Sequence, residues 1–293
     1  MEYFITDVFG EKKYSGNQLA TFFEFGTVSE DEMQQIAREI NYSETTFITC
    51  GEKINNGYDV RIFTPASEIE FAGHPTLGTA FIIDKYLEKG KSGKLLLNLR
   101  AGQIPVTKKN GFYWMKHNTP TFKKRIDPSI LAGVLSISEY DIIDKFPVQE
   151  VSTGLPVTIV PLKSMAALKR ASISKAEYEG FIEEAWGKVI LVFSRETYSP
   201  TQSLAVRVFV DYLGIPEDPA TGSAMGCLAA YLLNFGVLGK KRIEISVGQG
   251  YEIDRPSNLY IEATREGNEF DINVGGKVFE IARGIWGQGT VDS

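Results

Sequence analysis

The 293-residue sequence is poor in the side chains that build metal sites and disulfide frameworks, with only two cysteines and two histidines. Cys50 and Cys227 do not have the spacing of metal ligands, and the two histidines do not cluster with them. Two cysteines also suggest no disulfide framework. We therefore expect no metal site and a reduced, cytoplasmic setting.

The sequence also lacks long apolar runs and an excess of basic residues. No run approaches the roughly 20 apolar residues of a membrane-spanning helix. The acidic N-terminus, MEYFITDVFG, is typical of a strand and not of a signal peptide. Lys and Arg total 31 against 37 Asp and Glu, a net charge of −6, which argues against a nucleic-acid surface. We expect neither a membrane nor a nucleic-acid partner.

What the sequence does contain is many short β-rich runs, from YFITDVF near the start to KVFEIA near the end. Several are joined by Gly-containing turns such as Asn110-Gly111, which favours antiparallel or mixed sheets. Helices are fewer. Ser29 predicts the start of one helix, and Asp127-Pro128 predicts the start of another.

Two further helices are predicted over residues 76–89 and 224–235, and both are apolar most of the way round. A helix of this kind belongs in the centre of a domain. The chain is also long for one core. One such helix in each half therefore predicts two domains, each a sheet wrapped on a central helix.

The two halves resemble each other in sequence. RIFTPASEIEFAGHPTLGTAFII (61–83) and RVFVDYLGIPEDPATGSAMGCLAAYLL (207–233) both run from Arg-x-Phe through an acidic loop to a glycine and the apolar helix. From the arginine to that glycine the spacing is 12 in the first copy and 15 in the second. This indicates a duplication with one insertion. The polar segment 117–127 then suggests a boundary between domains 1–120 and 121–280, with a C-terminal strand at about 281–293 joining the first.

A glycine precedes the apolar helix in each half, in Gly73-His74 and in Gly222-Ser223. The first N–H groups of a helix have no internal partner and carry positive potential. If the halves face each other, the two helix ends would share a cleft that binds a carboxylate or an oxyanion. The alternative is that His74 and Ser223 only cap their helices, which for serine is the ordinary interpretation.

Two carboxylates lie where acid–base groups usually sit, on loops beside regular elements. Glu44 follows a predicted helix and precedes a strand, and Asp218 lies four residues before Gly222. The alternatives are a surface glutamate and an Asp-Pro turn. Glu217 is expected to be solvated, and His117, which has no acidic or glycine neighbours, is expected at the surface.

The motifs DVF, GNQLA, NYSETTF, VRIFTP, EIEFAGHPTLGTA, EDPATGSA and VGQG together resemble the PhzF family of phenazine-biosynthesis-like proteins, over the whole chain. The resemblance implies an α/β (α+β) fold of the diaminopimelate epimerase type. That fold has two similar domains, each a mixed, mostly antiparallel sheet curled around a central apolar helix, with the active site between them. It also implies an isomerase without cofactor or metal that acts on a small carboxylate-bearing substrate, and a homodimer.

The resemblance also assigns roles to residues that match the family motifs. The catalytic glutamate of the family matches Glu44, and three other family site positions match His74, Asp218 and Ser223. Backbone N–H groups for substrate binding are implied at Gly73 and Gly222. We also expect their motif neighbours Ser43 and Thr221 to contribute to substrate binding.

Related epimerases and proline racemases use two cysteines, each just before a helix-opening glycine. Here those positions are Ala72 and Thr221, so two-cysteine racemisation is not expected. The leading hypothesis is proton transfer by Glu44, assisted by His74, Asp218 and Ser223. Two alternatives stay open: a hydrolase or lyase with Ser223 as nucleophile and His74 as base, and a non-catalytic protein that binds a metabolite or a partner.

Overall fold

The computed structural model describes residues 1–26 and 28–287, and the chain divides into two compact units. The first unit holds Met1–Met115 together with the C-terminal segment from Gly276, and the second holds Lys116–Gly275. Of the predicted C-terminal strand, residues 288–293 lie outside the described residues. Within the described part of the chain, no helix has the length and apolar character needed to cross a membrane.

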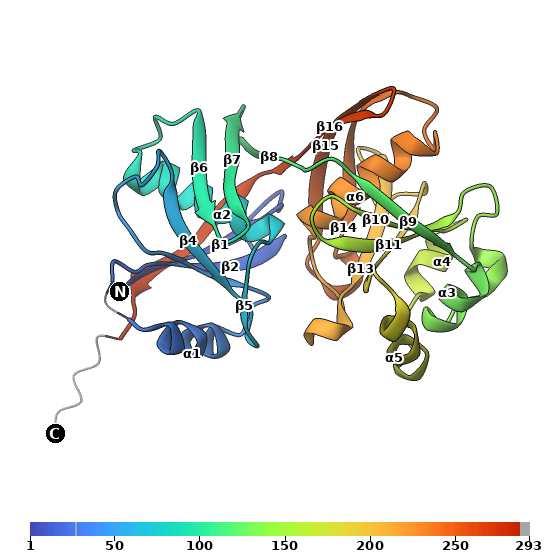
Figure 1. Cartoon of the computed structure of the whole chain (residues 1–293), viewed down its shortest axis with the longest axis horizontal. Coiled ribbons are helices and arrows are strands. Elements are labelled where there is room, and N and C mark those ends of the chain that lie inside the picture. Colours follow the sequence, from blue (N-terminus) through green and yellow to red (C-terminus); the bar gives the residue numbers. More distant parts are fainter. Residues whose placement is uncertain (27, 288–293) are drawn as a thin grey trace. The chain divides into compact units, whose positions relative to one another are not determined.

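The first unit is built on one mixed sheet with the strand order β17-β1-β2-β3-β4-β6-β7-β8, and the short β5 pairs with β4. Figure 1 shows β17, in red, running beside β1, in blue. Only two neighbouring pairs in that order are parallel, β2 with β3 and β4 with β6. The strands are β1 (Glu2–Val8), β2 (Asn17–Phe23), β3 (Thr45–Ile48), β4 (Tyr58–Phe63), β5 (Glu68–Ile69), β6 (Lys94–Leu99), β7 (Gly102–Lys109), β8 (Phe112–Lys116) and β17 (Val278–Ile285).

Helix α2 (Gly73–Ile82) is the centre of the first unit. All of its residues except Phe81 are buried, and it packs against β1, β2, β3, β6, β7 and β17. It begins three residues before the predicted range and continues as a π-helix, η1 (Ile83–Leu87). Helix α1 (Glu30–Ile40) packs against β3 and β4. It begins, as predicted, after Ser29, whose hydroxyl accepts a hydrogen bond from the Glu32 N–H.

The second unit has a mixed sheet with the strand order β9-β10-β11-β12-β13-β14-β15-β16. Its two parallel pairs are β11 with β12 and β13 with β14. The strands are β9 (Thr121–Ile126), β10 (Val148–Ser152), β11 (Pro156–Pro161), β12 (Val189–Ser194), β13 (Leu204–Phe209), β14 (Arg242–Gln249), β15 (Ser257–Glu266) and β16 (Glu269–Gly276).

Helix α6 (Gly222–Asn234) is the counterpart of α2, buried from Gly222 to Leu233 and packed against β10, β11 and β15. The apolar sequence around its whole circumference is what this position requires. The helix predicted after Asp127 is α3, with the Asp127 carboxylate capping its first turn. The remaining helices of the unit are α3 (Pro128–Val134), η2 (Glu139–Asp141), α4 (Met165–Arg170), α5 (Lys175–Glu184), η3 (Asp211–Leu213) and η4 (Tyr251–Ile253).

The two sheets follow the same pairing pattern from edge to edge. In each, two antiparallel pairs are followed by a parallel, an antiparallel and a parallel pair, and then by two more antiparallel pairs. In each, the central helix lies in the connection between the strands of the second parallel pair. The topology therefore supports the duplication inferred from the two arginine-to-helix segments.

His117 is buried in the second unit, so its predicted surface position is wrong. The side chain is 8% exposed, and its Nδ1 lies 3.1 Å from the hydroxyl of Thr153. Its ring packs against α6 at Gly226, where a side chain would occupy the same space. Burial lowers the pKa of His117 to about 4, so the folded protein holds the ring neutral at neutral pH.

Acid is expected to destabilise the second unit through this histidine. An unfolded histidine titrates near pH 6.5, so between about pH 6.5 and 4 the unfolded chain binds a proton that the folded chain does not. The stabilisation that comes from keeping His117 neutral is therefore complete above pH 6.5 and is lost as the pH falls. Between pH 7 and 5 it amounts to about 2 kcal/mol. Urea unfolding at both pH values measures the free energy of unfolding. Its fall from pH 7 to pH 5 should be smaller in His117→Gln than in the wild type by this amount. Equal falls in the two proteins would contradict the prediction.

Candidate active site

Neither His74 nor Ser223 caps its helix. The N-cap of α2 is Ala72 and that of α6 is Thr221, and no side chain caps either helix. His74 and Ser223 are instead the second residues of their helices, so the capping alternative is wrong for both. The first N–H groups of a helix generally have no partner one turn back, and donors of this kind bind anions at helix starts.

In the first unit, the structure brings Glu44 and His74 together. Glu44 lies between α1 and β3, after Asn41, which ends the helix in the left-handed conformation. His74 reaches it from the first turn of α2, with 3.4 Å between His74 Nε2 and Glu44 Oε2. The side chains are 4% and 14% exposed, respectively. The glutamate is therefore the more accessible member of a largely buried pair.

Asn17, the first residue of β2, completes this group. Its side-chain amide nitrogen lies 3.2 Å from His74 Nδ1, and both side chains are buried. Burial also lowers the pKa of His74 to about 3, so the ring is neutral at neutral pH. The neutral ring carries a single proton, and its Nε2 edge faces Glu44. Asn17, His74 and Glu44 thus lie in a row, with Asn17 on the Nδ1 side of the ring and Glu44 on its Nε2 side.

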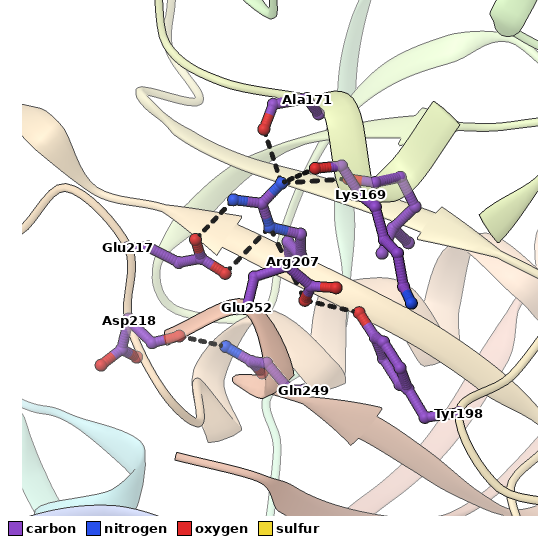
Figure 2. Close-up of polar contacts among 9 residues, drawn as sticks. Lys169, Ala171, Tyr198, Arg207, Glu217, Asp218, Gln249 and Glu252 are labelled. Atoms are coloured by element: carbon purple, nitrogen blue, oxygen red, sulfur yellow. Dashed lines mark hydrogen bonds and ion pairs between the residues drawn. The ribbon is translucent and has the colours of Figure 1, made fainter. Parts of the chain in front are cut away.

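In the second unit, Asp218 and Thr221 are joined directly. The Thr221 hydroxyl donates to Asp218 Oδ2 at 2.5 Å, and the two residues are each 7% exposed. Gln249, at the end of β14, is fully buried and ties this loop together. Its amide nitrogen donates to the Asp218 carbonyl at 2.7 Å, drawn in Figure 2, and to the Thr221 hydroxyl at 3.0 Å, while its oxygen accepts from the Thr221 N–H at 3.1 Å.

The predicted site residues therefore fall into two groups, one in each unit. The sequence motifs GNQLA and VGQG contain Asn17 and Gln249, but neither residue was predicted to have a role in the site. Their polar side chains beside glycines were the available signal. The prediction that Glu217 is solvated is wrong, because its side chain is 7% exposed and pairs with Arg207. The predicted residues of the first group are Ser43, Glu44, Gly73 and His74, and those of the second are Asp218, Thr221, Gly222 and Ser223.

The two cysteines lie outside both groups. Cys50 follows β3 and is half-buried, whereas Cys227 is buried within α6. Burial raises the pKa of Cys227 to about 11, so its thiol is protonated at neutral pH. Among residues 1–26 and 28–287, no three His, Cys, Asp or Glu side chains are grouped so that they could hold a metal ion.

Comparison with known proteins shows the family of this chain. A family model for phenazine biosynthesis-like proteins, PhzC-PhzF, matches residues 6–284. The chain belongs to the PhzC-PhzF family. It is 31% identical over 288 residues to the trans-2,3-dihydro-3-hydroxyanthranilate isomerase of Pseudomonas aeruginosa, covering 96% of this chain and 98% of that protein.

Solved structures of PhzC-PhzF relatives share the fold. A PhzF-family protein from Bacillus anthracis matches with a TM-score of 0.87 and 26% identity, over 97% of each chain. A probable proline racemase from Agrobacterium radiobacter matches with a TM-score of 0.62 over 99% of this chain and 94% of that one. At 9% identity, the racemase shows the fold alone. The prediction of a mixed α+β, diaminopimelate epimerase-like fold is confirmed.

Proposed function

We propose that this PhzC-PhzF protein is a cofactor-independent isomerase that moves a proton on a small carboxylate-bearing substrate. The observation that carries the proposal is the buried row of Asn17, His74 and Glu44, in which the acid, Glu44, is the most accessible side chain. Enzymes that transfer protons commonly hold such an acid with an oriented neighbour. The isomerase names of full-length relatives support the same class of reaction.

In the proposed reaction, Glu44 removes a proton from a substrate carbon and returns it at another position. His74 stays neutral and donates its Nε2–H, either to Glu44 or to the substrate. A neutral donor fits the lowered pKa of this histidine, because an imidazolium would instead pair with the carboxylate and weaken it as a base. General acid–base catalysis of this kind contributes about 10²–10⁴-fold.

The residues of the second group are proposed to take part in the same reaction. The N–H groups of the first turns of α2 and α6, at Gly73 and Gly222, bind its carboxylate or the developing enol oxygen, since such preorganised donors stabilise charge in the transition state. Asp218, oriented by Thr221, and Ser223 contact the substrate and assist the transfer. Gln249 maintains the loop that carries Asp218.

The chemistry is proposed not to use cysteine. Each cysteine of a two-cysteine racemase precedes a helix-opening glycine, and those places are taken by Ala72 and Thr221. The thiol of Cys227 is buried, and its raised pKa makes it a poor nucleophile and a poor base. The carboxylates therefore remain as the proposed proton carriers.

A solvent-exchange experiment tests this function. The candidate substrate is trans-2,3-dihydro-3-hydroxyanthranilate, the substrate in the relative's name, incubated with the protein in D2O and followed by NMR. We expect isomerisation with deuterium at the carbon that receives the proton, and the same rate for Cys50→Ala/Cys227→Ala. A product without solvent deuterium would argue against the acid–base mechanism. A cysteine-free variant that is folded but inactive would argue against the carboxylates as proton carriers.

A further inference from the structure

Arg207 and Glu217 form a buried ion pair directly beside the second group. Arg207 Nε donates to one oxygen of Glu217 at 3.0 Å and its Nη2 to the other at 2.7 Å, a two-pronged contact visible in Figure 2. The side chains are 9% and 7% exposed. Glu217 is followed at once by Asp218, so whatever fixes this glutamate also fixes the start of the Asp218 loop.

Arg207 is itself held from several directions. It lies on β13 with its guanidinium 4.9 Å from the ring centre of Phe209. A second carboxylate, that of Glu252, lies 3.9 Å from Nε and is bonded by the Tyr198 hydroxyl. Arg207 Nη1 donates to three carbonyl oxygens at the end of α4, those of Leu168, Lys169 and Ala171. A guanidinium with all its nitrogens engaged cannot turn away from its partner.

The first unit repeats the device before α2. Arg61 Nε and Nη2 donate to the two oxygens of Glu68 at 2.8 and 2.7 Å, and the guanidinium lies 5.1 Å from the ring centre of Phe63. Glu68 is 6% exposed, and pairing with Arg61 holds the pKa of its carboxyl below the ordinary range. Arg100 adds a second contact, 2.6 Å from the same carboxylate.

Spacing shows where the two copies differ. Seven residues separate Arg61 from Glu68, and ten separate Arg207 from Glu217. From the glutamate to the helix-opening glycine, however, the distance is five residues in both halves. The whole insertion in the second copy therefore lies between arginine and glutamate. Only the segment from the ion pair to the helix keeps its length, which is expected if the pair sets where that segment begins.

We propose that Arg61 and Arg207 are positioning residues, each of which holds through its glutamate the segment that leads into a site helix. In the second unit this segment carries Asp218 and Thr221, and in the first it leads to Gly73 and His74. The proposal rests on the proposed function, because the residues so positioned are those assigned to the reaction.

An ion pair suits this task better than an apolar contact. Replacing a buried ion pair by apolar side chains often leaves stability unchanged, so stability alone gives little reason to keep one. A two-pronged Arg–carboxylate contact, in contrast, fixes the direction as well as the distance of its partner. Misplacement of a reacting group by about 1 Å can cost about 10²-fold in rate. Lysine keeps the charge but cannot make the fork.

The test compares Arg207→Lys with Arg265→Lys in the full chain. Arg265 is a matched control, because its guanidinium also lies over a phenylalanine, Phe270 at 5.1 Å, but it bonds Asn234 at the opposite end of α6. Two measurements are made well below the unfolding temperature: kcat with trans-2,3-dihydro-3-hydroxyanthranilate, and amide hydrogen exchange of the peptide containing residues 218–221. In that peptide, the Asp218 N–H bonds the Val208 carbonyl and the Thr221 N–H bonds Gln249.

For Arg207→Lys we expect kcat to fall about 10-fold or more, and exchange in 218–221 to accelerate at least 10-fold, with neither change in Arg265→Lys. Glu217→Gln should have the same effects on kcat and on exchange. The double variant Arg207→Lys/Glu217→Gln should be no worse than either single variant, because all three lose the same Arg207–Glu217 contact. Arg61→Lys should have a smaller effect on residues 69–74, since Arg100 also holds Glu68.

Unchanged exchange in Arg207→Lys overturns the proposal, as does faster exchange with an unchanged kcat, which would make the pair merely structural. Effects that simply add in the double variant also count against it. If the wild-type chain isomerises none of the substrate, the proposed function has failed, and exchange in residues 218–221 alone decides whether the pair holds the segment.

Discussion

Replacing Glu44 with glutamine is expected to lower kcat by about 10²–10⁴-fold and to leave KM within a few-fold of the wild-type value. Glutamine keeps the size of the side chain and can occupy the same place, 3.4 Å from His74 Nε2. It cannot take up a proton. Loss of the base alone therefore removes the contribution of acid–base catalysis, while substrate binding, which depends on other groups, remains. Steady-state isomerisation kinetics give both constants.

A matched control is Glu39→Gln. Glu39 lies on α1, five residues before Glu44, and is exposed to solvent, so the same chemical change there should leave kcat and the stability unaltered. Deuterium uptake into the product should fall in Glu44→Gln together with kcat. A Glu44→Gln protein that keeps more than a tenth of the wild-type kcat would remove Glu44 as the proton carrier and with it the proposed mechanism.

Much of the fold followed from local chemistry. Helices α2 and α6 are apolar on nearly every side, and this composition alone places them at the centre of a domain. Ser29 and Asp127 were recognisable as helix starts because a capping side chain acts on its own neighbours in sequence. The duplication was visible because both copies keep arginine, glutamate and glycine in the same order.

What could not be predicted depends on contacts between distant segments. Glu217 looked solvated because its partner, Arg207, is recognisable only once the chain doubles back so that the Asp218 N–H bonds the Val208 carbonyl. Helix α4 was missed for a similar reason. It is six residues long and is held at its end by the Arg207 side chain, which lies on β13. Such short elements are stabilised by tertiary contacts more than by their own sequence.

His117 is the clearest case. Its own neighbours in sequence are polar, and they gave no reason to expect a buried ring. The space that it fills exists because position 226, far along the chain, is a glycine on a helix. A Cβ at Gly226 would lie 2.2 Å from His117 Nδ1 and less than 3 Å from two further ring atoms. Burial of this histidine is therefore a property of the pair.

Gly226→Ala is accordingly expected to destabilise the second unit by about 3 kcal/mol, the upper part of the range for overpacking a core. The ring cannot simply move aside. The His117 backbone N–H bonds the Ile272 carbonyl at 2.9 Å, and the ring Nδ1 lies 3.1 Å from the Thr153 hydroxyl. Urea unfolding followed by far-UV circular dichroism measures the change.

The chain supplies an opposite control in Gly180→Ala. Gly180 lies within α5, and a Cβ added there meets no atom within 4 Å. Alanine is a better helix former than glycine by up to about 1 kcal/mol, so this variant should be slightly more stable than the wild type. The same gain in helix propensity applies at Gly226. A net loss there therefore measures the collision with the histidine ring and not the choice of residue for a helix.

A double-mutant cycle separates that collision from other effects. His117→Ala alone removes a buried ring and leaves a cavity, which destabilises. In the Gly226→Ala background the same change also relieves the collision, so it should cost at least about 1 kcal/mol less, or become favourable. If the two losses instead add, the ring has found room elsewhere and Gly226 is not what admits it. Strong coupling would mean that the glycine and the histidine can change only together, although neither is recognisable as the other's partner from sequence.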